Sequence, residues 1–292
     1  MLNTLLAVVI SGIATGVIYS LVVLGVNLIV LVRRVLHFGF PYIVILSAFL
    51  DWQLLGWTHD NWFICLPAFF ILGIVLTLIS ELMFRNLARK GAFLESMIMG
   101  QGIAIIVVAI GNHFFNHGLM VSFPHSILGS GIGIKIGLIY FTLGNIYTLV
   151  GGIIFVVLLY LFLFRSMQGR AIRAMAQNRD VATDLGISFN RTGLIGFAFA
   201  GILAGATALF LAMILRAVDS ATGDALAVRV LILAMFAGMG NLTGGLIISL
   251  GMGIVEAISS AYIPGAWTEA IFFGIVMIVV LIKPAGIFGE RT

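Results

Sequence analysis

Charged residues are scarce in this chain of 292 residues. Only 9% of its residues are charged and 62% are apolar, whereas a soluble domain has about 25% charged and about 45–50% apolar residues. Soluble folds keep contiguous exposed apolar patches to about a few hundred Å². The composition therefore excludes an ordinary cytosolic enzyme and a disordered chain, and it indicates a membrane protein.

Cysteine, proline and phosphate-binding motifs are also rare or missing. Cys65 is the only cysteine, so an intrachain disulfide is excluded. The chain has 5 prolines and 35 glycines, which is typical of closely packed membrane helices. No Gly-x-x-x-x-Gly-Lys-[Ser/Thr] motif occurs, so any ATP and magnesium must be bound by a partner and not by this chain.

Catalytic and metal-binding patterns are weak. No serine or histidine stands in a pattern typical of a nucleophile with an oriented base, so we do not expect an enzyme. His113 and His117 are four residues apart, with His125 further on. Without a carboxylate or cysteine beside them this spacing is poor evidence for a metal site, and we expect none.

Long apolar runs account for most of the sequence. A run of about 20 residues crosses about 30 Å of hydrocarbon. The stretch 226–262 is interrupted by glycines, so it predicts either two thin spans or a re-entrant pair. We therefore expect an all-α polytopic integral membrane protein, a single domain over 1–292, with eight or nine membrane segments. The other predicted spans are 5–32, 38–56, 62–84, 93–112, 145–165, 192–216 and 266–283.

The cations predict the orientation of these spans. Of the 15 lysines and arginines, 12 lie in loops that alternate to one side, and the positive-inside rule makes that side cytoplasmic. The N-terminus is then outside and the C-terminus inside. The net charge of +4 is thereby explained without nucleic-acid binding. The 12 cations are Arg33, Arg34, Arg85, Arg89, Lys90, Arg165, Arg170, Arg173, Arg179, Arg191, Lys283 and Arg291.

Two hydrophilic loops stand out. The loop at 113–144 is expected outside, with a short hairpin over 129–137. The loop at 166–190 is expected in the cytoplasm, with an amphipathic helix over 174–187 that stops at Gly186, since glycine commonly ends helices in a left-handed conformation. Such a helix is either a handle for a moving cytoplasmic partner or part of a solvated linker whose cations hold anionic lipid.

Polar residues within the spans are few. Glu256 lies in an apolar segment and is either functional or bonded to a neighbouring helix, and we favour the bond. Arg229 is expected to orient its half-helix at the outer boundary, with Asp224 as its neighbour. Glycines four residues apart are expected to let helices pack closely. These glycine pairs are Gly12 with Gly16, Gly201 with Gly205, and Gly240 with Gly244.

Beyond composition, the run GRAIRAMAQNRDVATDLGISFNRTGLIGFAFAGILAGATA at 169–208 strongly resembles the permease subunits of branched-chain amino-acid ABC transporters. Segments 11–30, 84–105, 236–263 and 283–289 resemble other parts of the same family in the same order. The resemblance covers nearly the whole chain. It implies a permease of an ATP-driven importer in the bacterial inner membrane.

The resemblance also implies partners. They are a second homologous permease or a second copy, two ATP-binding subunits, a periplasmic solute-binding protein and membrane lipid. The loop at 166–190 is then the coupling helix that docks on the ATP-binding subunit. Asp184 opposes the helix dipole there, so we expect it to pair with Arg179 or with a cation of that subunit. The residues expected to couple are Met175, Gln177, Arg179, Asp180, Asp184, Leu185 and Gly186.

One segment departs from the family pattern. Where the family usually has Asn-Phe-Ala-His-Gly near the translocation path, this chain has His37, Phe38, Gly39, Phe40 and Pro41. A bulkier, more aromatic path suits a larger or less polar solute, unless a second permease supplies the polar groups. The residues expected to line the path are Asn27, His37, Phe38, Phe40, Tyr42, Gly238, Gly240 and Asn241.

The solute therefore stays open. Amino acids, with branched-chain hydrophobic ones first, follow from the resemblance, and urea, short amides or other small organic solutes are the alternative. A passive channel or ion-coupled carrier is a different class of function. It predicts an ion path of charged residues in the membrane, for which Glu256 alone is a poor candidate.

Overall fold

The computed structural model describes residues 2–59, 61–115, 120–123, 127–136, 139–283 and 286–289. Long helices make up most of these residues, with two short helices and four short strands between them. The long helices are α1 (Leu2–Arg33), α2 (Phe40–Trp57), α3 (Trp62–Lys90), α4 (Phe93–Phe114), α5 (Leu143–Arg165), α8 (Phe189–Leu215), α9 (Ser220–Ala237), α10 (Leu242–Tyr262) and α11 (Gly265–Ile282). The short helices are α6 (Met167–Gln177) and α7 (Arg179–Asp184).

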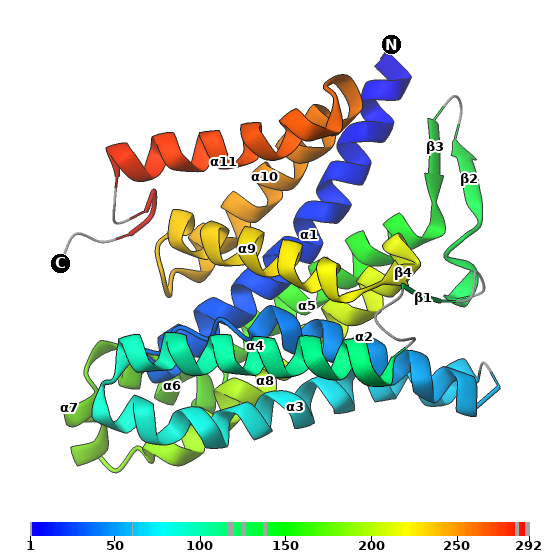
Figure 1. The fold of residues 1–292 in the computed structure, drawn as a ribbon. Helices are drawn as coiled ribbons and strands as arrows, with labels where there is room; N and C mark the ends of the chain where they lie inside the picture. The colour runs from blue at the N-terminus through cyan, green and yellow to red at the C-terminus, as the bar shows by residue number, and fades with distance from the viewer. Residues whose placement is uncertain are drawn as a thin grey trace.

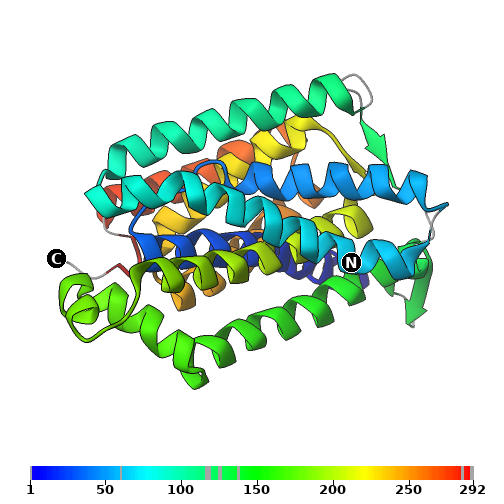
Figure 2. The ribbon, with the colours of Figure 1, turned by 90° about the horizontal axis from the view of Figure 1, so that it is seen from below.

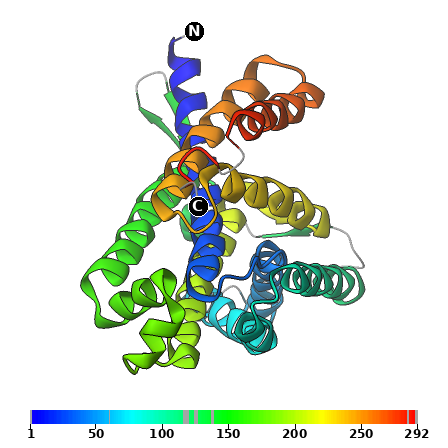
Figure 3. The same ribbon diagram turned by 90° about the vertical axis from the view of Figure 1, so that its left-hand side faces the viewer.

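The long helices form a bundle with two distinct ends. Helices α6 and α7 and the C-terminus lie at one end, at the left of Figure 1, which we call the basic end. The strands β2 (Gly133–Ile136) and β3 (Ile139–Thr142) lie at the other, which we call the hairpin end. Seen along the bundle in Figure 3, α1 runs through the centre with the other helices around it. Most of α1 is accordingly buried.

The expected fold class is confirmed. Within the described ranges, eight helices are long and apolar enough to cross a membrane, and the apolar part of α11 is shorter. The stretch 226–262 belongs to two separate helices: the later part of α9, which has 18 residues and begins at Ser220, and the whole of α10, which has 21. Their connection at 238–241 lies toward the basic end (Figure 1), and not midway along the bundle as a central opening of the backbone would require.

Glycines let the helices approach closely. A Cβ at Gly16 would lie 2.9 Å from the Cα of Leu250, where α1 crosses α10. A Cβ at Gly205 would lie 2.8 Å from the Cα of Phe70, where α8 crosses α3. The packing role predicted for these two glycine pairs is confirmed. Gly240 differs, because its φ of +82° serves the turn between α9 and α10.

Two local predictions need correction. The hairpin exists but is formed by β2 and β3, with Gly133 paired to Thr142, so it begins later than 129. The loop at 166–190 holds two helices where one was expected, because Asn178 is extended (φ −149°, ψ 110°) and its side chain caps the backbone N–H groups of Asp180 and Val181. Asparagine competes with the helix in this way because its amide oxygen is a strong N-cap acceptor.

One pairing had no counterpart in the sequence analysis. Strand β1 (Val121–Ser122) pairs antiparallel with β4 (Ala217–Val218), between α8 and α9. It joins the long loop at the hairpin end to the connection between two core helices. Two-residue strands carry too little periodic pattern to be predicted.

Candidate functional site

The loop at 166–190 ends its second helix as its sequence predicts. Gly186 has a φ of +84°, the left-handed conformation that glycine adopts without strain. The N–H of Gly186 donates to the carbonyl of Thr183 at 2.9 Å, and that of Ile187 donates to Ala182 at 3.0 Å. These bonds close the last turn of α7 and turn the chain back toward α8.

The residues expected to couple the permease to an ATP-binding subunit divide into two groups by their exposure. Gln177, Asp180, Asp184, Leu185 and Gly186 are exposed, whereas Met175 is buried and Arg179 is half-buried. Leu185 is the apolar member of the exposed group and is 77% exposed. Val181, which was not among the residues expected to couple, lies one helical turn before it and is 54% exposed. Val181 and Leu185 thus form an exposed apolar edge at the basic end of the bundle.

Two arginines attach this loop to the membrane helices. Arg34, which follows α1, donates to the carbonyl of Ala176 in α6 at 2.8 Å. Arg179, the first residue of α7, donates to the carbonyl of Ala88 in α3 at 3.0 Å and stacks on the ring of Phe189 at 4.1 Å. These contacts connect α6 and α7 directly to the ends of α1 and α3.

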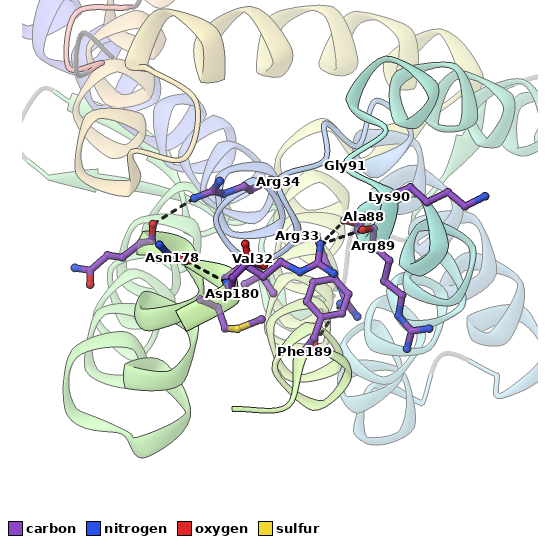
Figure 4. Close-up of a pocket in the computed structure, with 13 residues that line it drawn as sticks. Val32, Arg33, Arg34, Ala88, Arg89, Lys90, Gly91, Asn178, Asp180 and Phe189 are labelled. Carbon is purple, nitrogen blue, oxygen red and sulfur yellow. Dashed lines mark hydrogen bonds between the residues drawn. The ribbon is translucent and has the colours of Figure 1, made fainter. Parts of the chain in front are cut away.

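A basic cavity of about 490 Å³ lies between these elements. Figure 4 shows Arg34 and Asn178 on one side of it and Ala88 to Gly91 on the other. Five cations and one carboxylate line it, so it attracts anions. The charged lining residues are Arg33, Arg34, Arg89, Lys90, Arg179 and Asp180.

Below the cavity lies an ion-pair cluster that the sequence analysis missed. Arg33 of α1 is buried and pairs with the buried carboxylate of Glu81 in α3. Arg85 binds the same carboxylate at 2.6 Å from one helical turn away. The spacing of Glu81 and Arg85 in a predicted span was the available indication. Arg179, the expected partner of Asp184, makes its bonds to the carbonyls of α3, and Asp184 joins none of the ion pairs among the described residues.

The aromatic segment after α1 is packed inside the bundle. His37 is fully buried, with its ring 4.3 Å from that of Phe84. Burial lowers the pKa of His37 to about 3, so the ring is neutral at physiological pH. Phe40 is also fully buried and lies against Gly25, while Phe38 is partly buried against the core. Their role in solute choice stays a prediction.

The turn between α9 and α10 is braced from both sides. Asn27 of α1 accepts from the N–H of Gly240 at 3.1 Å and donates to the carbonyl of Asn241 at 3.1 Å. The side chain of Asn241 donates to the carbonyl of Phe288 at 2.9 Å. Gly238, with a φ of +94°, packs on the backbone of Gly289. Four of the residues expected to line the path thus meet in one braced turn.

Loss of this brace has a measurable cost. Asn27→Ala leaves the N–H of Gly240 without its acceptor and removes one of the two donors to the carbonyl of Asn241, which keeps its bond from the N–H of Gly245. An unsatisfied N–H of this kind costs about 1–3 kcal/mol. We expect the thermal transition of the purified chain in detergent to fall by several degrees. Ser20→Ala is the matched control, because buried Ser20 bonds only to its own helix, at Val17. Equal thermal transition temperatures for Asn27→Ala and Ser20→Ala would contradict a stabilising role of Asn27 at this turn.

A polar cluster near the middle of the bundle joins four helices. The guanidinium of Arg229 lies 3.1 Å from Glu256 and 3.5 Å from Glu269, and it donates to the hydroxyl of Tyr19 at 3.0 Å. That hydroxyl donates to Glu256 at 2.7 Å. The interhelical bond expected for Glu256 is confirmed.

The expected neighbour of Arg229 is different. Asp224 accepts from the hydroxyl of Tyr42 at 2.7 Å, and the partners of Arg229 come from α10 and α11. Residues five positions apart on a helix point to different faces, which is why Asp224 and Arg229 serve separate contacts. Tyr42, one of the expected path residues, therefore links α2 to α9.

Metal ligands do not gather in the part of the chain that the structure describes, where no group of three or more His, Cys, Asp or Glu side chains could hold an ion. The ring of His113 packs edge-on against Phe114 at 4.7 Å. His117 and His125 lie outside the described residues.

Comparison with known proteins gives a family match over the whole bundle. Residues 8–281 match the family model described as branched-chain amino acid transport system / permease component. A probable branched-chain amino acid transport permease protein, LivH, of Methanocaldococcus jannaschii is 27% identical over 94% of this chain and 90% of its own length.

Other relatives match over shorter stretches. The high-affinity branched-chain amino acid transport system permease protein LivH of Escherichia coli K12 is 30% identical over 132 residues, which are 45% of this chain and 43% of that protein. The autoinducer 2 import system permease protein LsrC of Enterobacter sp. strain 638 is 25% identical over 67% of this chain and 59% of its own length. No solved structure matches the chain significantly.

Proposed function

Because the chain belongs to the family of branched-chain amino acid transport permeases, we propose that it is the membrane-spanning subunit of an ATP-driven importer of amino acids, with branched-chain hydrophobic ones first. The proposal rests on the extent of the family match. Residues 8–281 include every long helix of the bundle except the first residues of α1 and the last residue of α11. The chain acts as a single permease domain and catalyses no reaction itself.

The proposal includes an orientation in the inner membrane. The basic end, with α6, α7 and the C-terminus, faces the cytoplasm, as the positive-inside rule requires. The hairpin end and the N-terminus face the periplasm. Two ATP-binding subunits, which hold ATP and magnesium, dock below, and a solute-binding protein docks above. A second homologous permease, or a second copy of this chain, completes the path within the lipid bilayer.

Coupling follows from the contacts at the basic end. The exposed edge of Val181 and Leu185 seats in a groove of the ATP-binding subunit, and acidic side chains of that subunit enter the basic cavity. When ATP binding draws the two ATP-binding subunits together, α7 moves with its groove. Arg179 and Arg34 carry this movement to the ends of α3 and α1, and α1 is the central helix of the bundle.

The alternatives concern the solute and the energy source. One relative is named as a permease protein of an autoinducer 2 import system. This name supports other small organic solutes, including urea and short amides, as the second candidate. A passive channel or ion-coupled carrier is the different class. The polar cluster around Arg229 pairs its charges with one another, and so does the cluster around Glu81, which disfavours a continuous ion path.

Uptake by the complete transporter tests the proposal. The chain, its second permease and the ATP-binding subunits are reconstituted in vesicles with the binding protein and radiolabelled solutes. We expect leucine uptake with ATP, and none with a non-hydrolysable ATP analogue. Solute entry without ATP would overturn the importer in favour of a channel or carrier. ATP-driven uptake of urea or acetamide without leucine would establish the alternative solute.

A further inference from the structure

The polar cluster around Arg229 forms the floor of a second cavity. This cavity measures about 250 Å³ and lies between α1, α8, α9 and α10. Leu215, the last residue of α8, and Thr222, in the first turn of α9, line it at the hairpin end. Tyr19, Arg229 and Glu256 line it deeper in the bundle. The cavity therefore runs from the hairpin end toward the middle of the membrane.

Charge separation at the floor suits a molecule with charges of both signs. Arg229 faces two carboxylates, and the side chains of Arg229 and Glu256 remain 23% and 16% exposed, whereas Glu269 is 64% exposed. The cluster thus offers a cation and an anion side by side, neither of them sealed in the core. A guanidinium recognises a carboxylate in a bidentate fashion, and a glutamate recognises an ammonium.

The walls above the floor are apolar. Ile18, Leu211, Ile214 and Leu226 line the cavity, so a bound solute finds hydrocarbon beside its charged groups. The volume equals that of about eight waters in the liquid, which is close to the nine non-hydrogen atoms of leucine. Size, walls and floor together fit one small zwitterion with an aliphatic side chain.

A structural explanation alone accounts poorly for these charges. Ionisable groups within a membrane protein are costly and commonly mark solute pathways. A buried ion pair often holds a structure no better than apolar side chains of equal volume. A cluster that served only to join α1, α9, α10 and α11 would not need to stay open to a cavity.

We propose that Arg229 and Glu256 bind the α-carboxylate and the α-ammonium of the transported amino acid, with its aliphatic side chain against α1, α8 and α9. The solute enters at the hairpin end and replaces the partners of the Arg229–Glu256 pair with its own charges. Tyr19 bonds to both residues and is a positioning residue. This inference rests on the proposed function and names the solute contacts within it.

Protection of a cysteine at the mouth of the cavity tests the proposal. Leu215→Cys is introduced into the complete transporter and labelled with an impermeant maleimide from the hairpin side, because the side chain of Leu215 is exposed there. The unchanged chain is the background, since its single cysteine, Cys65, is buried. We expect leucine to slow the labelling. Isovalerate, which lacks the ammonium, and isoamylamine, which lacks the carboxylate, should protect at least about tenfold more weakly.

Two variants then separate recognition from packing. Glu256→Gln should reduce the preference for leucine over isovalerate, and Arg229→Gln the preference for leucine over isoamylamine. Tyr160→Phe is the matched control, because it removes a polar bond between α5 and α10 to Thr243, and neither residue lines the cavity; it should change neither preference. If a charge variant fails to assemble, the protection of Leu215→Cys by leucine, isovalerate and isoamylamine still tests whether both charges of the solute are recognised.

Three outcomes would overturn the proposal: no protection by leucine, equal protection by all three molecules, or the same loss of preference in both charge variants. After any of these outcomes, the cluster would have only a structural role in joining α1, α9, α10 and α11. Vesicles that import leucine without protecting the cysteine would refute this site while the proposed function stands. Vesicles that import another solute by ATP hydrolysis would instead refute the proposed amino-acid substrate.

Discussion

Replacing Val181 and Leu185 together by aspartate should release the ATP-binding subunits from the permease and stop ATP-driven uptake. The two side chains form the exposed apolar edge of α7. An aspartate at either position would bring an unpaired charge into an apolar groove, and a loss of about 2 kcal/mol at each position corresponds to about thirtyfold in affinity. Pull-down of the ATP-binding subunits on the tagged chain and vesicle uptake measure both effects, and we expect each to fall below about a tenth of the unchanged protein.

Thr183→Asp is the matched control for this double variant. Thr183 is also exposed on α7. It lies two positions from both Val181 and Leu185, and residues two positions apart on a helix point to nearly opposite faces. The Thr183→Asp variant should therefore show uptake, and binding of the ATP-binding subunits, close to those of the unchanged chain. If the double variant keeps both the ATP-binding subunits and its uptake, α7 is not the coupling element.

Gly253→Leu should prevent the chain from folding into a monodisperse bundle. A Cβ at Gly253 would lie 2.7 Å from the carbonyl oxygen of Gly12 and still closer to the backbone of Gly16. Backbone atoms cannot turn aside as a side chain can, so α10 must separate from α1 along its length. Overpacking commonly costs about 1–3 kcal/mol, and a whole leucine between two touching backbones exceeds that. Size-exclusion chromatography of a fluorescent fusion in mild detergent reports the result.

Gly251→Leu tests whether the position or the glycine matters. Gly251 lies on the same helix, and a Cβ there meets no atom within 4 Å. The variant should elute as a single peak at the position of the unchanged chain. Aggregation of both variants would show that α10 tolerates no leucine at either position, and the close crossing with α1 would then not be the cause.

Local features of the sequence were predictable because their physics is local. The apolar runs set the long helices, since each needs only its own length and composition to cross a membrane. Gly186 ends α7 in a left-handed conformation because glycine is the residue that adopts it freely. Asn178 could also have been identified as a cap by its type, but the continuous helical composition around it favoured one helix over two.

Contacts between distant residues were not predictable in the same way. Tyr19 and Glu256 are 237 positions apart, and nothing in either neighbourhood specifies the other. The cavity above them exists only because α1, α8, α9 and α10 meet around it. Glu256 and Arg229 were each identified as polar residues in apolar surroundings, yet their pairing depends on how the helices are arranged in three dimensions.

The braced turn between α9 and α10 bears on how the protein is made. Asn27 precedes Gly240 by 213 positions, whereas Phe288 follows Asn241 by 47 positions. The turn acquires its full set of hydrogen bonds only when both are present. Helix α1 is therefore synthesised long before the turn that Asn27 binds, and the bonds of Asn27 to this turn form only after α9 and α10 have been made.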